Sequence, residues 1–249
     1  MKTEDKTEQF LFKIDVKYLF AICKNLKDLI TEVRFNLDKN GLKIVEIEPA
    51  NICLIDVVLN KGLFQQLEIE DNKTFGLNVD NLYNILKEQK KQDVKVYQNN
   101  IGSADKLIFS FSNGFKSELC LIDIETDKKN IPIMEHKTEV TLKSKRFKEI
   151  IKNCVNVADA LIIEKKDDDV FFIAEGLNRT EIKLQPDEVR ATGENSKSKY
   201  SLEYLNKFIK ELISENVTLK FNNDYPLIVE YNIPYFKINY LLAPRIGED

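Results

Sequence analysis

The sequence is poor in the residues that most enzymes use. It contains no tryptophan, one histidine and eight glycines in 249 residues. It has no glycine-rich phosphate-binding or dinucleotide-binding motif, and His136 would have to act alone in any Ser-His, Cys-His or histidine-metal site. These shortages argue against nucleotide-dependent and nucleophilic catalysis. We therefore expect no catalytic residue, no metal site and no cofactor.

Cysteine is also scarce, with four residues at positions 23, 53, 120 and 154. Their spacing contains no C-x-x-C pair, and they lie within apolar, periodic runs. This pattern predicts reduced core cysteines, and it favours neither disulfides nor a zinc site.

Long apolar runs are missing as well. No run reaches the ~18 residues that cross a membrane, and residues 1–9 are too polar for a signal peptide. We expect an intracellular, soluble protein.

The chain contains two copies of one pattern. Residues 17–25 return as 145–153, residues 82–88 return as 205–211, and the pair Phe115-Lys116 returns as Phe236-Lys237. Three matches in the same order indicate a duplication with a period of about half the chain, which means two similar domains rather than a solenoid. The predicted organisation is a flexible tail 1–9, a first domain 10–121, a connector 122–139 and a second domain 140–249.

Each half is predicted to be β-rich with two helices, an α+β fold. Asp15 is expected to cap a helix over 16–30, and Asp80 one over 81–91. Ser144 is expected to cap a helix over 145–155, and Ser201 to start one over 202–213. Strands or hairpins are expected over 33–47, 52–59, 94–97, 106–122, 161–174, 217–221, 227–233 and 236–242. The segment 186–198 is read as a polar connection. Three aspartates at 167–169 are more typical of a solvated turn than of a metal site.

Charge is unevenly distributed. The formal net charge is −4, but the four predicted helices hold 12 basic and five acidic residues, a net charge of +7, which leaves −11 on the rest of the chain. A basic surface on an otherwise acidic molecule suits a polyanion held at one place. Lysine recurs at equivalent helix positions in both copies, and lysines on helices bind phosphates without reading bases. A generic solvated helix face is the alternative. No aromatic residues are expected among these lysines, which argues against single-strand stacking.

Several short stretches resemble one family. They are 26–30 (LKDLI), 48–54 (EPANICL), 204–206 (YLN), 226–231 (PLIVEY) and 241–246 (LLAPRI). In register, they are similar to the sliding clamps of the proliferating cell nuclear antigen type, known in archaea and eukaryotes. The resemblance implies a DNA clamp fold: a ring of three subunits and six similar domains, with pseudo-six-fold symmetry, whose helices line a channel around duplex DNA. It also implies a processivity factor for DNA replication and repair rather than an enzyme.

The resemblance and the charge pattern together give the candidate DNA-facing residues, which are the lysines of the four helices: Lys17, Lys24, Lys27, Lys87, Lys90, Lys91, Lys145, Lys148, Lys152, Lys207 and Lys210. The sequence departs from the family at Phe20, Ala21, Asn84 and Asn156, where relatives often carry a basic residue or histidine.

The resemblance further implies a pocket for partner peptides of the form Q-x-x-hydrophobic-x-x-aromatic-aromatic. The matching positions are Ile47, Asn51, Ile52, Leu54, Ile131, Pro132, Pro226, Leu241, Leu242, Ala243 and Pro244. Here His136 replaces an aromatic residue and Lys129 an apolar one. The apolar run at 131–134 within a polar connector agrees with this site, although it could equally fix the connector to a sheet.

Subunits of such rings are joined through edge strands. The candidates are 115–121 and 179–184, with Phe115, Ser117, Leu119 and Leu121 facing Arg179, Glu181, Ile182 and Leu184 of the next subunit. The implied partners are double-stranded DNA, DNA polymerase, an ATP-driven clamp loader, flap endonuclease and DNA ligase, with a homotrimer expected. Its place would be the cytoplasm or nucleoid of an archaeon, or a eukaryotic nucleus. The alternatives are one subunit of a heterotrimeric clamp, a protein-interaction module that does not meet DNA, and a nuclease using the aspartates at 167–169 with magnesium.

Overall fold

The computed structural model describes residues 8–99, 105–124 and 131–247. The chain forms two compact units, each described here by itself. Unit 1 comprises Met1–Glu46, Val57–Lys129 and Pro234–Phe236, and unit 2 comprises Ile47–Asp56, Asn130–Ile233 and Lys237–Asp249. Most of the expected tail 1–9, most of the middle of the connector and Lys129 lie outside the described residues.

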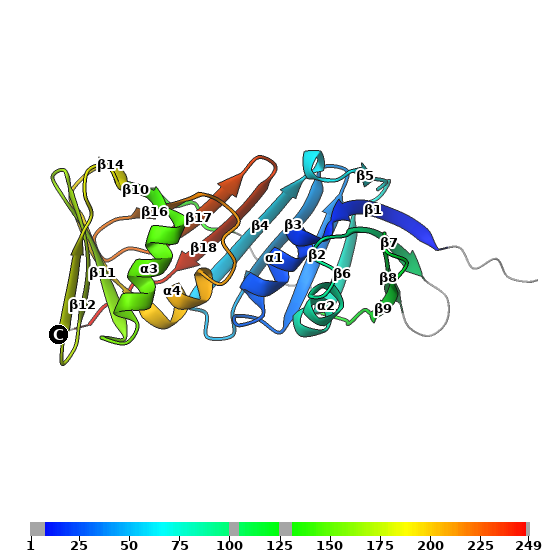
Figure 1. Ribbon diagram of the computed structural model, residues 1–249, viewed down its shortest axis with the longest axis horizontal. Coiled ribbons are helices and arrows are strands. Elements are labelled where there is room, and N and C mark those ends of the chain that lie inside the picture. Colours follow the sequence, from blue (N-terminus) through cyan, green and yellow to red (C-terminus); the bar gives the residue numbers. More distant parts are fainter. Residues whose placement is uncertain (1–7, 100–104, 125–130, 248–249) are drawn as a thin grey trace, which may run out of the picture. The chain divides into compact units, whose positions relative to one another are not determined.

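Unit 1 contains the helices α1 (Val16–Leu26) and α2 (Val79–Leu86), which pack against each other (Figure 1). Asp15 caps α1 as predicted, since its side chain accepts a hydrogen bond from the Lys17 amide at 2.9 Å. The cap of α2 is Asn78, whose side chain accepts from Asn81, so the prediction of Asp80 as the cap was wrong. Both helices are shorter than predicted. α2 ends because the buried stripe ends at Leu86 and no residue from 87 to 91 is buried.

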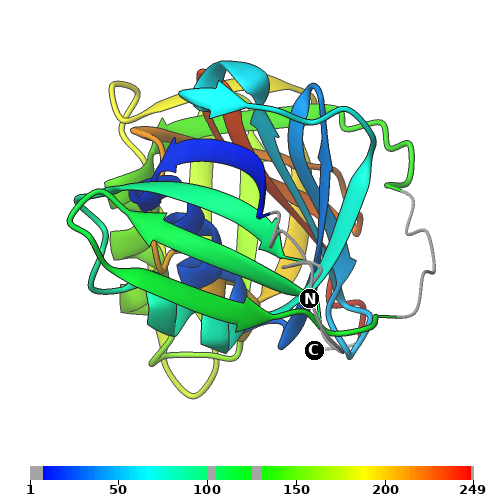
Figure 2. The same ribbon diagram turned by 90° about the vertical axis from the view of Figure 1, so that its right-hand side faces the viewer.

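The strands of unit 1 form two groups. One sheet has the order β5-β1-β7-β8-β9, and Figure 2 shows β1, β7, β8 and β9 side by side. The bounds are β1 Gln9–Asp15, β5 Gln66–Leu67, β7 Asp93–Asn99, β8 Lys106–Phe111 and β9 Lys116–Cys120. The other group has the order β4-β3-β2-β6, with β2 Glu32–Asp38, β3 Gly41–Ile47, β4 Cys53–Asn60 and β6 Lys73–Asn78. A 3₁₀ turn, η1 (Lys61–Leu63), follows β4.

Unit 2 contains α3 (Ser144–Cys154) and α4 (Leu202–Phe208), which also pack against each other. Phe147, Ile150, Ile151 and Cys154 recur with the helical period along α3, and all four are fully buried. Lys143 occupies the N-cap position of α3 and Ser144 is its first residue, so the predicted Ser144 cap was wrong. Ser201 precedes α4 as predicted, but α4 ends at Phe208 because Ile209 has a non-helical backbone (φ −105°, ψ 15°).

The strands of unit 2 also form two groups. One has the order β14-β10-β16-β17-β18, with β10 Thr138–Lys143, β14 Val189–Gly193, β16 Asn216–Phe221, β17 Leu227–Ile233 and β18 Phe236–Leu242. The other is β13-β12-β11-β15, with β11 Ala160–Lys166, β12 Asp169–Glu175, β13 Arg179–Lys183 and β15 Ser196–Ser201. The prediction of 186–198 as a polar connection was therefore wrong, because β14 and the start of β15 lie in it.

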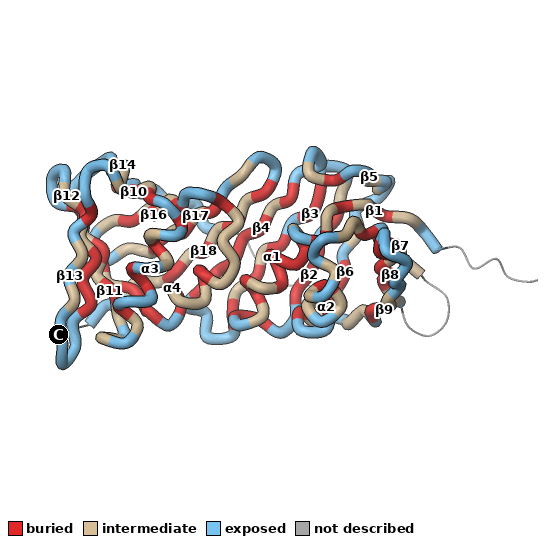
Figure 3. The backbone as a smooth tube through the Cα atoms, in the orientation of Figure 1, coloured by how far each residue is buried: buried red, intermediate tan, exposed pale blue. Residues whose placement is uncertain are grey.

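Burial alternates along strands such as β18 and follows one side of α3, whereas most of β4 and of α1 is buried (Figure 3). In unit 2 the rings of Phe208 and Tyr240 stack at 4.1 Å between centroids, and both side chains are buried.

Cys23, Cys53 and Cys154 are buried as predicted, but Cys120 is exposed on β9. Within the described ranges, none of the helices has the length and apolarity required to cross a bilayer.

Candidate functional site

The lysines of unit 1 gather around the two aromatic rings that join its helices. Tyr83 on α2 packs against Phe20 on α1, with ring centroids 5.5 Å apart. The ammonium groups of Lys24 and Lys27 lie 5.6 and 4.5 Å from the centre of the Tyr83 ring, and that of Lys90 lies 4.2 Å from the Phe20 ring. Such contacts hold a cation over an aromatic face while its outer side remains hydrated.

This arrangement corrects the expectation that no aromatic residue lies among the lysines. The rings are nevertheless no open stacking platform, because Phe20 is buried, Tyr83 is partly buried and lysines lie over their faces. Lys17 is held by Asp15 at 2.8 Å, and its pKa is raised chiefly by that hydrogen bond. Lys87 donates to the side chain of Asn84 at 3.2 Å.

The lysines of unit 2 lie along α3 and α4. Lys152 on α3 donates to Asn206 on α4 at 2.9 Å. Lys207 pairs with Glu203 one turn earlier at 2.7 Å and lies 4.9 Å from the centre of the Tyr204 ring. All eleven candidate lysines lie on the four helices or within five residues of a helix end. The structure places Lys27, Lys87, Lys90, Lys91 and Lys210 beyond the helices in which they were predicted.

The predicted peptide pocket has its counterpart within unit 2. Ile47 to Leu54 form a turn between β3 and β4, with Asn51 in the left-handed region at φ 58°. Ile52 is 40% exposed, and its carbonyl oxygen accepts a hydrogen bond from the amide of Ala243 at 2.9 Å. The turn and the C-terminal tail therefore meet at this bond. Leu54 and Leu242 are buried and supply packing beneath the surface.

The C-terminal tail after β18 is hydrogen-bonded to β15 of unit 2. The Arg245 amide donates to the Lys199 carbonyl at 2.7 Å. Hollows of about 740 and 640 Å³ are both lined by 245–247, the larger also by Leu177 and the smaller by Lys197. The side chains of Leu177 and Ile246 are largely exposed beside the larger hollow. Apolar side chains and open space thus adjoin the predicted pocket.

The connector reaches this part of unit 2 through His136. Its Nε2 lies 2.9 Å from the carbonyl oxygen of Pro226, and its ring meets that of Tyr225 edge to face at 5.5 Å. Pro226, one of the predicted pocket residues, is therefore fixed to the connector. Ile131 and Pro132 are exposed, as is Ile133. Their apolar surface is available to a partner.

Sequence reasoning missed two residues of this site, Glu48 and Tyr204. The Glu48 carboxylate is buried and accepts hydrogen bonds from the amides of Ala50, Ile52 and Cys53 at 2.7, 2.6 and 3.2 Å. Burial alone raises the pKa of Glu48, but these bonds and one from Tyr204 outweigh it and lower the pKa. Burial raises the pKa of Tyr204 to about 12, with the charge of Glu48 adding to it. The sequence signal that could have identified Glu48 is its place before Pro-Ala-Asn, because proline and asparagine mark a turn just ahead of the apolar strand.

The two predicted interface strands lie at sheet edges. β9 ends the order of its sheet in unit 1, and β13 ends that of its sheet in unit 2. Leu119 and Leu184 point into their own units, whereas Phe115 is 63% exposed. On β9, Lys116 pairs with Glu8 and Glu118 with Lys106, both at 2.9 Å. On β13, Arg179 lies against both Glu175 and Glu181. Both edges therefore present alternating charge.

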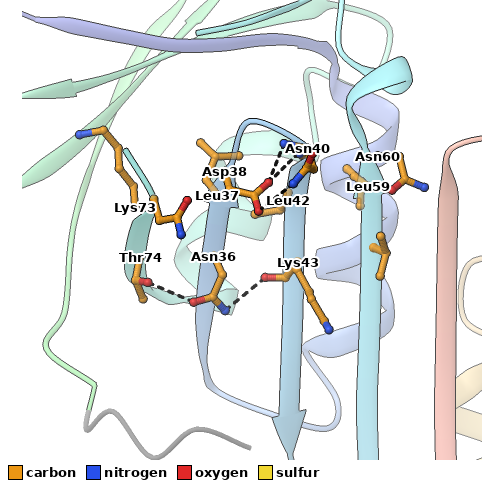
Figure 4. A pocket seen from close by; sticks show the side chains of 13 residues that line it. Asn36, Leu37, Asp38, Asn40, Leu42, Lys43, Leu59, Asn60, Lys73 and Thr74 are labelled. Carbon is orange, nitrogen blue, oxygen red and sulfur yellow. Dashed lines mark hydrogen bonds between the residues drawn. The ribbon is translucent and has the colours of Figure 1, made fainter. Parts of the chain in front are cut away.

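Two other features carry no predicted site. Figure 4 shows a hollow of about 330 Å³ in unit 1, where Asn36 bridges Thr74 and the Lys43 carbonyl. Asp38 closes the β2–β3 turn there by accepting from Asn40 and Gly41. In unit 2, Asp167 and Asp168 are exposed in the β11–β12 turn and Asp169 pairs with Lys183 at 2.6 Å. Over the described ranges, no set of three metal-ligating side chains comes together.

Comparison with known proteins agrees with this architecture. Residues 15–131 match the model of the N-terminal domain of proliferating cell nuclear antigen, and residues 130–245 match that of its C-terminal domain. The chain belongs to the proliferating cell nuclear antigen family. Both halves of the sequence repeat thus correspond to domains of this family, and the predicted clamp fold is confirmed.

Two archaeal sliding clamps and one solved structure illustrate the similarity. The chain is 31% identical over 230 residues to the DNA polymerase sliding clamp of Thermococcus gammatolerans, covering 89% of this chain and 92% of the relative. It is 30% identical over 243 residues to that of Thermococcus onnurineus, covering 94% and 96%. The crystal structure of proliferating cellular nuclear antigen from Entamoeba histolytica has the same fold, with a TM-score of 0.89 at 21% identity over 96% of this chain and 100% of that one.

Proposed function

We propose that this chain is a DNA polymerase sliding clamp, a non-catalytic ring of three subunits that encloses duplex DNA and tethers the polymerase to it. The observation that carries the proposal is the concentration of lysines on the four helices or within five residues of their ends, in a family fold whose net charge is negative. Lysines bind phosphates regardless of base sequence, so the ring holds DNA and still slides. Tethering raises the effective concentration of the polymerase at the primer end.

Membership of a family whose named relatives are DNA polymerase sliding clamps supports this function. A ring that encloses DNA acts in the compartment that holds the chromosome, the nucleoid in an archaeon or the nucleus in a eukaryote. We extend the proposal to a clamp loader, a flap endonuclease and a DNA ligase as further partners, all approaching the same peptide site.

The peptide site is proposed to comprise the β3–β4 turn, Pro226, the exposed connector residues and the C-terminal tail. The bonds between Ala243 and Ile52 and between His136 and Pro226 support it, since the first joins the tail to the turn and the second joins the connector to Pro226. Exposed apolar side chains such as Ile131 and Ile52 suit the hydrophobic and aromatic anchors of a peptide.

The subunit contact is proposed to pair the β9 edge of one copy with the β13 edge of the next. Open edges carry unpaired backbone groups and need a cover. The alternating charges of both edges suit such pairing. A homotrimer follows if each copy supplies both edges.

The deciding experiment compares retention of the protein on circular and on linear DNA. The molar mass of the purified chain is first measured by light scattering over a concentration series, where three times 29.0 kDa is expected. A clamp loader then places it on circular or linear DNA, and retention is compared. A ring stays on the circle and slides off the free ends of the linear form. Equal loss from both forms would sink the proposal, and a persistent monomer or dimer would point to sister subunits.

A further inference from the structure

All backbone donors of the β3–β4 turn converge on one residue. The amide of Ala50 reaches one oxygen of the Glu48 carboxylate, and those of Ile52 and Cys53 reach the other. The amide of Asn51 donates to the Glu48 carbonyl at 2.9 Å. Pro49 has no amide to donate. Every N–H from 50 to 53 is therefore satisfied by Glu48, within a turn that carries the left-handed Asn51.

Only an ionised carboxylate satisfies this arrangement. Its two oxygens are acceptors only, so they receive the three amide bonds. The Tyr204 side chain on α4 adds to the lowering of the Glu48 pKa. A glutamine of the same shape would turn an NH₂ group toward at least one of these donors. Bonds to a charged acceptor are also stronger than those to a neutral one. The chemistry of the turn thus depends on the charge of Glu48 and not only on its size.

The same turn positions two elements of the partner surface. Ile52, whose amide donates to Glu48 at 2.6 Å, presents a half-exposed apolar side chain. Its carbonyl accepts from Ala243, which begins the C-terminal tail. A continuous series of hydrogen bonds therefore runs from Glu48 through Ile52 to the tail, and every link lies within unit 2.

We propose that Glu48 is the positioning residue of the partner-peptide site, where its carboxylate keeps the 49–53 turn in the shape that presents Ile52 and anchors the C-terminal tail. Because the turn is held before a partner arrives, the peptide does not have to order it. The inference rests on the proposed peptide site. Glu48 itself does not have to touch the peptide.

The test compares the full-length protein with its Glu48→Gln variant. The probe is a labelled synthetic peptide with the Q-x-x-L-x-x-F-F pattern, and its dissociation constant is measured by fluorescence anisotropy. We expect Glu48→Gln to raise the dissociation constant by about tenfold or more, as the loss of charged hydrogen bonds implies. Glu215→Gln, at an exposed glutamate paired with Lys143, is the matched control and should bind as the parent does.

A second readout does not depend on any partner. Hydrogen exchange should quicken at the amides of Ala50, Ile52, Cys53 and Ala243 in Glu48→Gln, while the core amides and the solution mass stay unchanged. A variant that binds the peptide with parental affinity, or that keeps parental exchange at these four amides, would overturn the positioning role.

Failure of the peptide site and failure of this inference are distinguishable. If the parent protein does not bind the peptide, the proposed site is lost, and exchange at the four amides still decides whether Glu48 holds the turn. If Glu48→Gln does not fold, Tyr204→Phe replaces it, since it removes the hydroxyl group that helps to keep the Glu48 carboxylate ionised and leaves the turn covalently unchanged. We expect a rise of about two- to fivefold in the dissociation constant for Tyr204→Phe, and parental affinity would contradict the proposal.

Discussion

Lys152 on α3 donates a hydrogen bond to the side chain of Asn206 on α4 over 2.9 Å. The bond orients the ammonium group at the contact of the two helices, and Lys152 remains exposed. A lysine held in place loses less freedom when it meets a phosphate. We therefore expect helix lysines to contribute to DNA binding as a set, with Lys152 among the stronger members.

The first prediction reverses one lysine on or next to each helix to glutamate: Lys24, Lys87, Lys152 and Lys210. Polymerase product length on primed circular DNA should fall by about tenfold or more, because four attractive contacts per subunit become repulsive. The salt dependence of DNA binding should also become shallower. The control reverses four exposed lysines away from the helices, Lys39, Lys43, Lys166 and Lys197. If both sets behave alike, the helix faces are not the DNA surface.

The second prediction concerns stability against pH. Burial raises the pKa of Glu230, but the hydrogen bond from Lys237 at 2.8 Å and the nearby charge of Lys220 outweigh it and lower the pKa. A lowered folded-state pKa stabilises the fold above the ordinary value of 4.5 and loses that contribution as pH falls through the folded pKa. Glu230→Gln should lower the free energy of unfolding by about 1–2 kcal/mol at pH 7. When this free energy is measured by urea unfolding over a range of pH, its fall in acid should be smaller for the variant than for the parent protein.

Glu139, which also lies near Lys220, provides a matched control for Glu230. Glu139 lies 3.9 Å from Lys220 but is 50% exposed. Glu139→Gln should change the unfolding free energy by less than about 0.5 kcal/mol, because exposed ion pairs are weak. Equal effects of the two glutamine variants would show that burial of Glu230 is not the cause.

The third prediction gains stability by removing a hydroxyl group. The hydroxyls of Tyr231 and Tyr240 are buried and have no hydrogen-bond partner among the described residues. Tyr240→Phe keeps the ring that stacks on Phe208 and removes an unsatisfied polar atom. We expect an unchanged or raised melting temperature. Phe208→Ala should instead destabilise by about 3–5 kcal/mol, since it opens a cavity beside the same ring. Loss of stability in Tyr240→Phe would reveal an unseen partner for the hydroxyl.

The fourth prediction tests the subunit contact. Phe115 precedes β9 and is 63% exposed. Phe115→Asp should weaken ring assembly by roughly 30-fold or more if this side chain is buried against the next copy, and light scattering at low concentration should show monomer. Ile133→Asp places the same charge at a fully exposed apolar residue of the connector and should leave the mass unchanged. A parental mass for Phe115→Asp would move the interface elsewhere.

Much of the fold follows from local pattern. The stripe through Phe147, Ile150 and Ile151 identified α3 because buried side chains recur with the helical period. Helix ends were less accurate, since the charged residues after Leu86 continue a helical composition without any residue to bury. β14 was missed because its sequence, Val-Arg-Ala-Thr-Gly, lies at the end of its sheet order and has no buried residue. Polar edge strands give little alternation to detect.

Some residues of the candidate site were also predictable from the sequence, and others were not. The family resemblance supplied Ile52, Ala243 and Pro226. Within unit 2, hydrogen bonds join Ile52 to Ala243 and Pro226 to His136. It did not supply Glu48, because the convergence of amides on its carboxylate arises from the left-handed backbone of Asn51 and from the approach of Tyr204, which lies far away in sequence. Likewise, the rings beneath the lysines become visible only when α1 and α2 are packed together.

The boundaries of the two compact units do not coincide with those of the two sequence repeats. Unit 2 includes Ile47–Asp56 from the first repeat, and unit 1 includes Pro234–Phe236 from the second. A fragment that stops at the connector would lack the Tyr235 carbonyl that accepts from the Asn60 amide and the Tyr235 ring that covers Gly62. Each compact unit thus contains a segment of the other repeat. We therefore expect two separately expressed halves to restore the native protein together, by complementation, rather than to fold alone.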